Sequence, residues 1–116
     1  MKKVLLLSLI LTNFYLLNAQ GVWTNKAVPS IGNRLGAFSC SVGTKGYMGG
    51  GEYTTGGGYF TDWWEYDPVT NVWTQKANYT TTGNGRSRGT SFSIGTSGYI
   101  VCGKAAGPTV FNETRR

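Results

Sequence analysis

RLGAFSCSVGTKGY, the segment Arg34–Tyr47, occurs a second time as RSRGTSFSIGTSGY, the segment Arg86–Tyr99, fifty-two residues later. Seven of the positions are identical, and Val42 is matched by the similar Ile94. The identical pairs are Arg34/Arg86, Ser39/Ser91, Ser41/Ser93, Gly43/Gly95, Thr44/Thr96, Gly46/Gly98 and Tyr47/Tyr99. A period of about fifty residues is typical of proteins built from repeated supersecondary units.

A second block of sequence repeats at almost the same spacing. Val22–Ala27 reads VWTNKA and Val72–Ala77 reads VWTQKA, fifty residues apart and identical at five of six positions. The spacing differs by two residues because of the polar segment Tyr79–Gly85, where surface insertions are tolerated. The two blocks together indicate an internal repeat that spans most of the chain.

The repeated unit is predicted to contain four β-strands. The expected strands are Ala37–Val42, Gly46–Gly50, Asp62–Asp67 and Val72–Lys76. Turn residues separate them, with Gly43-Thr44-Lys45 after the first strand and Asp67-Pro68-Val69-Thr70-Asn71 after the third. No segment beyond the N-terminus shows a sustained apolar period of 3.6 residues, so we expect an all-β fold without helices.

The repeat frame also predicts parts of two further units. Val22–Lys26 corresponds to the last strand of a preceding unit, and Thr90–Cys102 to the first two strands of a following one. The chain would therefore hold one complete four-stranded sheet with fragments on either side.

Composition agrees with many short strands and excludes several other classes. The 116 residues include 18 glycines, and aromatic and charged residues each contribute 14%, against about 25% charged residues in an average protein. This balance disfavours a helical bundle, a coiled coil or a charged disordered chain. The chain has no histidine, which excludes a Ser-His-Asp triad and histidine-containing metal sites within it.

The N-terminus has the pattern of an export signal. Lys2 and Lys3 precede the apolar run Val4–Leu17, which leads to Ala19 and then Gln20. A helix that crosses a bilayer needs about 20 residues, and this run is shorter. We therefore expect a cleaved signal and no stable membrane span. The expected organisation is a signal at 1–19, repeats at 20–103 and an irregular tail at 104–116, in a secreted or periplasmic protein of bacterial type.

The unit resembles the kelch repeat. The matching elements are Arg34, the strand Gly46-Tyr47-Met48-Gly49-Gly50, the turn Tyr66-Asp67-Pro68 and Trp73. The resemblance implies a β-propeller of the kelch and galactose oxidase-like superfamily, in which each unit is one antiparallel blade. It places Ala37–Val42 nearest the axis and Val72–Lys76 at the rim. It gives structural roles to Arg34, Gly49, Gly50, Tyr66, Asp67, Trp73 and Arg86.

The predicted strands are too few for a closed propeller, which usually has four to eight blades. Two explanations stay open. The chain is the front part of a longer propeller, or it completes a ring by self-association or with a partner chain.

The residues that could carry chemistry are better explained by structure. Gly49–Gly51 and Gly56–Gly58 lack the lysine and helix of a phosphate-binding loop, and Asp62, Glu65 and Asp67 lack the spacing of a calcium site. We therefore predict no catalytic residues, no metal and no cofactor. Trp64, Tyr66 and Trp73 are expected to fill the space between blades.

Four residues allow further expectations. Tyr53 and Tyr59, in the glycine-rich loop, are the candidates for ligand contact. Cys40 and Cys102 form an even pair in an exported chain, which favours a disulfide, but their predicted strands lie in different blades, which disfavours one.

The functional prediction is an exported, non-catalytic module that binds a protein or a glycan. The net charge of +6 comes from scattered cations, which is weak support for nucleic acid, and none is expected as a partner. The alternative is a fragment of a kelch-type carbohydrate-active enzyme, either galactose oxidase-like or a sugar epimerase, whose catalytic residues lie outside this chain. Galactose oxidase chemistry relies on histidine ligands to copper, and this chain has none.

Overall fold

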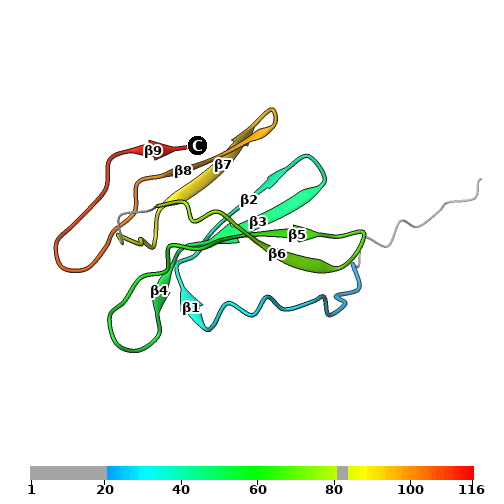
Figure 1. Cartoon of the computed structure of the whole chain (residues 1–116), viewed down its shortest axis with the longest axis horizontal. Coiled ribbons are helices and arrows are strands. Elements are labelled where there is room, and N and C mark those ends of the chain that lie inside the picture. Colours follow the sequence, from blue (N-terminus) through cyan, green and yellow to red (C-terminus); the bar gives the residue numbers. More distant parts are fainter. Residues whose placement is uncertain (1–20, 81–83) are drawn as a thin grey trace, which may run out of the picture.

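The computed structural model describes residues 21–80 and 84–116. Within them the chain forms nine β-strands, arranged in three antiparallel sheets, and no helix. The sheets stand side by side without closing into a ring (Figure 1). This confirms the all-β, open arrangement that the repeat predicts. The expected export signal, 1–19, lies outside the described residues.

The first sheet has four strands in the order β2-β3-β5-β6. Its members are β2 (Phe38–Val42), β3 (Lys45–Gly49), β5 (Trp63–Asp67) and β6 (Val72–Lys76), each antiparallel to its neighbour. All four predicted strands are confirmed to within a residue at each end. The agreement follows from the turn residues, since Gly43 and Asn71 both adopt the left-handed backbone conformation that tight turns need (φ 58° and 57°).

The second sheet has three strands, β7 (Thr90–Ile94), β8 (Ser97–Val101) and β9 (Thr114–Arg115), in that order. A small third sheet pairs β1 (Arg34–Leu35) with β4 (Glu52–Tyr53). The bridge between Ser87 and Lys104 repeats this pairing fifty-two residues later, so the second unit copies the first even in its minor contacts.

The segment 104–116, expected to be irregular, supplies β9. Thr114 pairs with Val101 as Trp63 pairs with Gly49 in the first sheet, so β9 occupies the place of β5. The second unit therefore contributes three strands, where two were predicted. Val110 forms an isolated bridge with Lys104.

The prediction of a strand at 22–26 is wrong. These residues have no strand partner in the part of the chain that the structure describes, and the side chain of Trp23 is fully exposed. The same sequence forms β6 fifty residues later because β5 lies beside it and supplies hydrogen bonds. Strand propensity alone does not order a segment whose backbone groups have no neighbouring strand.

The two large sheets meet along their first strands, β2 and β7 (Figure 1). The Ser91 hydroxyl donates a hydrogen bond to the Ser39 carbonyl (2.6 Å) and accepts one from the Ser39 amide (3.1 Å). The best buried apolar side chains lie near this junction, with Phe38 2% and Ile100 5% exposed. Gly50 and Gly51 allow the close approach, because a Cβ atom on Gly50 would lie 2.6 Å from the Phe38 ring and the Gly51 amide donates to the Arg86 carbonyl (2.8 Å).

Alternation along the strands gives each sheet two faces. We call the face of the first sheet that bears Cys40, Tyr47 and Trp63 its forward face, because the second sheet packs against it. The opposite face, which bears Met48 and Trp64, is its rear face. The second sheet presents its own rear face, with Gly98 and Ile100, to the forward face of the first.

Candidate functional site

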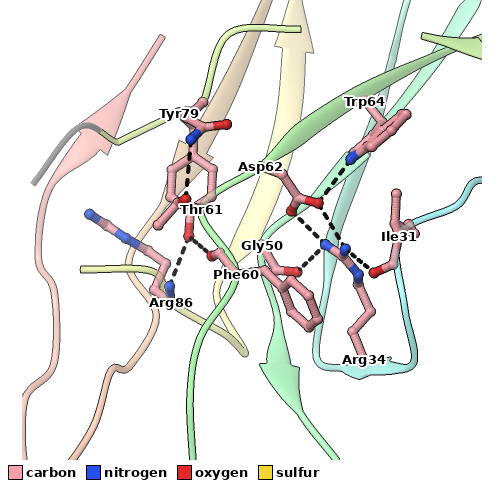
Figure 2. A network of polar contacts seen from close by, with 10 residues as sticks. Ile31, Arg34, Gly50, Phe60, Thr61, Asp62, Trp64, Tyr79 and Arg86 are labelled. Atoms are coloured by element: carbon pink, nitrogen blue, oxygen red, sulfur yellow. Dashed lines mark hydrogen bonds and ion pairs between the residues drawn. The ribbon is translucent and has the colours of Figure 1, made fainter. Parts of the chain in front are cut away.

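Arg34 holds together the two ends of the loop between β3 and β5. Its guanidinium donates to the Gly50 carbonyl (2.8 Å), to both carboxylate oxygens of Asp62 (2.7 and 2.8 Å) and to the Ile31 carbonyl (Figure 2). The guanidinium carbon also lies 3.8 Å from the centre of the Phe60 ring. Bidentate pairing and ring stacking both depend on the planar shape of arginine, so lysine could reproduce these contacts only in part.

Arg86 repeats this arrangement in the second unit. It donates to the Cys102 carbonyl (3.2 Å) and pairs with the Glu113 carboxylate, and its guanidinium carbon lies 3.8 Å from the centre of the Phe111 ring. Each partner is the repeat equivalent of a partner of Arg34. The side chain of Arg86 is fully buried, so this arginine belongs to the core and not to a ligand surface.

Tyr79 connects the two arginine clusters across the junction (Figure 2). Its hydroxyl donates to the Phe60 carbonyl (2.9 Å) and accepts from the Arg86 amide (2.8 Å). Its ring meets those of Phe38 and Trp63 edge-on, at 6.1 and 6.4 Å between centroids. Burial raises the pKa of the Tyr79 phenol, which keeps the hydroxyl protonated and able to donate at neutral pH.

All five carboxylates of the chain are engaged in ion pairs. The pairs are Glu52 with Arg88, Asp62 with Arg34, Glu65 with Lys76, Asp67 with Lys45, and Glu113 with Arg86 and Arg115. Burial acts to raise the pKa of Asp62, but hydrogen bonds from Arg34 and Trp64 and the charge of Arg34 bring this pKa below its ordinary value. Such carboxylates remain ionised at neutral pH. They can therefore hold ion pairs, but they have no proton to donate as a general acid.

Tyr47 and Glu65 form a polar pair on the forward face. The Tyr47 hydroxyl donates to the Glu65 carboxylate (2.6 Å), and this hydrogen bond, with burial and the charge of Glu65, raises the pKa of Tyr47 to about 12. The same bond, with Lys76 at 3.2 Å, lowers the pKa of Glu65. Tyr47 is therefore a hydrogen-bond donor here and not a phenolate base.

A cleft of about 390 Å³ opens between the forward face of the first sheet and the rear face of the second. Its lining combines aromatic and apolar side chains with the guanidinium groups of Arg115 and Arg116. The lining residues are Cys40, Val42, Tyr47, Trp63, Ala77, Asn78, Tyr79, Thr96, Gly98, Ile100, Arg115 and Arg116. A concave site with an aromatic wall and few polar groups is the usual form of a ligand pocket.

The candidate contact residues Tyr53 and Tyr59 lie elsewhere, on the glycine-rich loop. The Tyr53 ring is 46% exposed and packs on Phe60 at 4.1 Å between centroids, and Tyr59 is half-buried and bridges to Glu52. Neither lines the cleft. Beyond Tyr53 the loop projects outward, since a Cβ atom on Gly56 or Gly57 would meet nothing within 4 Å.

The residues expected at structural repeat positions lie within the first sheet and at the junction. Asp67 accepts from the Val69 amide (2.8 Å) in its turn, and Tyr66 packs on Trp73 at 5.0 Å between centroids. The Trp73 indole donates to the Ala27 carbonyl (2.8 Å), which fastens the N-terminal segment to β6. Trp64, Tyr66 and Trp73 are half-buried on the rear face of the first sheet and therefore do not face the second sheet.

Cys40 and Cys102 carry free thiols. Cys40 faces the cleft, where burial raises the pKa of its thiol, and Cys102 is exposed on the loop after β8. Among residues 21–80 and 84–116, no group of three or more histidine, cysteine, aspartate or glutamate side chains could hold a metal ion. No helix of the described residues is long and apolar enough to cross a membrane.

Sequence reasoning missed Tyr79, Phe111, Glu113 and Arg115. A signal for two of them was present, since Phe111 and Glu113 match Phe60 and Asp62 at a spacing of fifty-one residues. The loop of the second unit is one residue shorter, which hid the match at the fifty-two-residue spacing. No comparable signal marks Tyr79, because its role depends on where the connection between the sheets crosses the core.

Comparison with known families gives the unit a name. The kelch motif matches residues 33–78, which span the first sheet and the Arg34 cluster. Residues 33–78 are a kelch repeat. The resemblance that the sequence suggested is thus confirmed, and the kelch fold accounts for the four antiparallel strands in sequential order.

A search of curated proteins found no match to the chain. Among solved structures, that of YjhT is similar at 14% sequence identity and a TM-score of 0.49, over 79% of this chain and 44% of YjhT. The chain thus spans less than half the length of that protein.

Proposed function

We propose that this kelch chain is an exported, non-catalytic module that binds a protein or glycan ligand in the cleft between its two large sheets. The observation that carries the proposal is the cleft itself, which combines an aromatic wall with two arginines. The pattern Lys2-Lys3 followed by an apolar run supports export.

The cleft residues favour a ligand with both a flat apolar face and polar groups. Trp63 offers an indole surface, which suits the C–H face of a sugar ring or an aromatic side chain. Arg116 lines the cleft and donates from Nε to the Ser97 hydroxyl (2.9 Å), and we expect its Nη donors to bond the polar groups of the ligand.

The chemistry around the cleft supports binding without turnover. Glu113, which pairs with the cleft-lining Arg115, is shared between Arg86 and Arg115, and hydrogen bonds from Arg86 and then Arg115 lower the pKa of Glu113. A general acid needs a pKa near the working pH, and ion pairing moves the pKa of Glu113 in the opposite direction.

The test is a screen of the purified chain against glycan and extracellular-protein arrays, with each bound ligand re-examined by chromatography for conversion. We expect binding without product, weakened at least tenfold by Arg116→Ser, a substitution at an exposed position. Val69→Ser, at an 88% exposed turn position outside the cleft, is the matched control and should bind normally. Product formation, or binding that Arg116→Ser leaves unchanged, would contradict the proposal.

A further inference from the structure

The contact between the two large sheets joins two kinds of surface. The forward face of the first sheet gives Cys40 and Val42, and the rear face of the second gives Gly98 and Ile100. Gly98 makes the approach possible, since a Cβ atom there would lie 3.2 Å from the Cys40 sulfur and 3.5 Å from Val42. The hydroxyl of Ser91 completes the contact by bonding both backbone groups of Ser39.

The repeat places a second example of each surface on the outside of the chain. The forward face of the second sheet has Phe92, Ile94 and Tyr99 where the first sheet has Cys40, Val42 and Tyr47. This face is open: Phe92 is 41% and Ile94 65% exposed. The Phe92 and Tyr99 rings stack at 5.1 Å between centroids, so the two side chains form one continuous apolar surface.

The rear face of the first sheet carries the matching half. It has Ser39, Gly46 and Met48 where the second sheet has Ser91, Gly98 and Ile100. A Cβ atom on Gly46 would have Tyr66 as its nearest neighbour at 3.7 Å, so the surface above this glycine is free for a side chain from outside. The serine and the glycine that make the internal contact are both preserved here.

We propose that the forward face of the second sheet docks on the rear face of the first sheet of a second copy of this chain. The contact repeats the internal one: the Phe92 ring lies over Gly46, and the Ser39 hydroxyl bonds the backbone of Ser91. The external contact is more apolar than the internal one, because Phe92 replaces Cys40 and Trp64 of the first sheet occupies the place of Arg115.

A second copy is the occupant that fits best, because one chain carries both halves of a contact already formed within it. The two halves are different surfaces, so the association is head-to-tail. Such contacts continue from copy to copy and give a ring when the rotation closes, or an open stack when it does not.

The test measures the oligomeric state of the full chain by analytical ultracentrifugation over a range of concentrations. We expect wild-type assemblies larger than a dimer. Phe92→Asp removes the forward half at an exposed position, and Gly46→Leu blocks the rear half, where the space above the strand accommodates a side chain. Each variant alone should be monomeric, and circular dichroism should show that both retain the β fold.

Mixing the two variants distinguishes this mode from others. Phe92→Asp keeps an intact rear face and Gly46→Leu an intact forward face, so an equimolar mixture should form a one-to-one dimer and nothing larger. Val69→Asp places the same charge on an exposed turn and should assemble like the wild type. A monomeric wild type, assemblies unaffected by Phe92→Asp, or a mixture that stays monomeric would each overturn the proposal.

Discussion

Arg34 carries a charge that is almost completely removed from water, since its side chain is 5% exposed. The charge is tolerated because Asp62 accepts two hydrogen bonds and the Gly50 and Ile31 carbonyls accept one each, although the buried Nε has no partner among the described residues. Two features of the sequence predict a structural role for this arginine: it recurs as Arg86, and the serine and glycine positions that follow recur with it. The carboxylate partner could not be predicted, because Asp62 lies twenty-eight residues away.

Replacement of Arg34 by alanine should lower the free energy of unfolding by about 3 kcal/mol, because Asp62 would remain largely buried without its cation. Arg34→Lys should recover only part of the loss, since an ammonium cannot pair with both carboxylate oxygens in one plane. Urea denaturation followed by tryptophan fluorescence measures both. Lys26→Ala, at an exposed position, is the control, and an Arg34→Ala protein as stable as this control would disprove the assignment.

Cys102 is a non-glycine residue in the left-handed region (φ 59°), at the position that Gly50 occupies in the first unit (φ 60°). In the first unit the Phe38 ring leaves no room for a Cβ atom on Gly50. The second unit has the smaller Thr90 in the place of Phe38, so Cys102 can carry a side chain, although its backbone conformation is strained.

Cys102→Gly should therefore raise the free energy of unfolding, by about 0.5–1 kcal/mol after the added flexibility of the unfolded chain is subtracted. Thermal denaturation under reducing conditions measures the change. Cys102→Ala keeps the Cβ atom and removes the thiol, so it should leave stability unchanged. Equal gains from both variants would point to the thiol instead of the backbone.

At the level of elements, the strands of the first sheet were predictable because turn residues bound them on both sides. β9 was not, since Thr114-Arg115-Arg116 lacks the aromatic residues of its counterpart Trp63-Trp64-Glu65. Its place is fixed from outside the strand, by the pairing of Arg86 with Glu113 and by hydrogen bonds to β8. The opposite case is 22–26, which has the sequence of a strand and no neighbour to pair with.

The connection between the two large sheets depends on the hydroxyl of Tyr79. Tyr79→Phe should lower the free energy of unfolding by about 1–2 kcal/mol, because it leaves the buried amide of Arg86 without an acceptor. Tyr66→Phe, which loses only an exposed bond to Asn71, is the matched control and should cost less. Chemical denaturation compares the two, and equal costs would contradict the role given to Tyr79.

At the scale of the whole molecule, the ion pairs predict how stability depends on pH. The pKa values of Glu52, Asp62, Glu65, Asp67 and Glu113 are all lowered in the folded chain. A carboxyl group whose pKa is lowered by folding stabilises the folded chain at pH values above its pKa in the unfolded chain, which is about 4. This contribution is lost as the pH falls through the pKa of the folded chain. With no histidine to titrate, stability should be flat between about pH 5 and 8.

Urea midpoints measured from pH 8 to pH 2 test this profile. The expected result is a plateau followed by a steady fall below about pH 4. A maximum of stability in acid would contradict it, because that would require carboxyl groups whose pKa values are raised by folding.

The boundary between repeats and tail can also be tested on the whole chain. A chain that stops after Gly103 loses β9, Glu113 and the Phe111 ring, so the fully buried Arg86 retains its charge without a carboxylate. Hydrogen exchange should show lost protection in β7 and β8, with β3 and β5 less affected. Unchanged protection in β8 would mean that residues 104–116 are an accessory tail.

The two arginine clusters hold the ends of unequal loops in the same way. Residues 51–61 and 103–112 differ in length and in almost every side chain, yet each begins after a carbonyl bound to an arginine and ends at a carboxylate bound to the same arginine. Each arginine thus fixes the two ends of its loop without depending on the residues between them. Inserts of different length and sequence could therefore be exchanged between these ends while the four-stranded sheet beneath them is left unchanged.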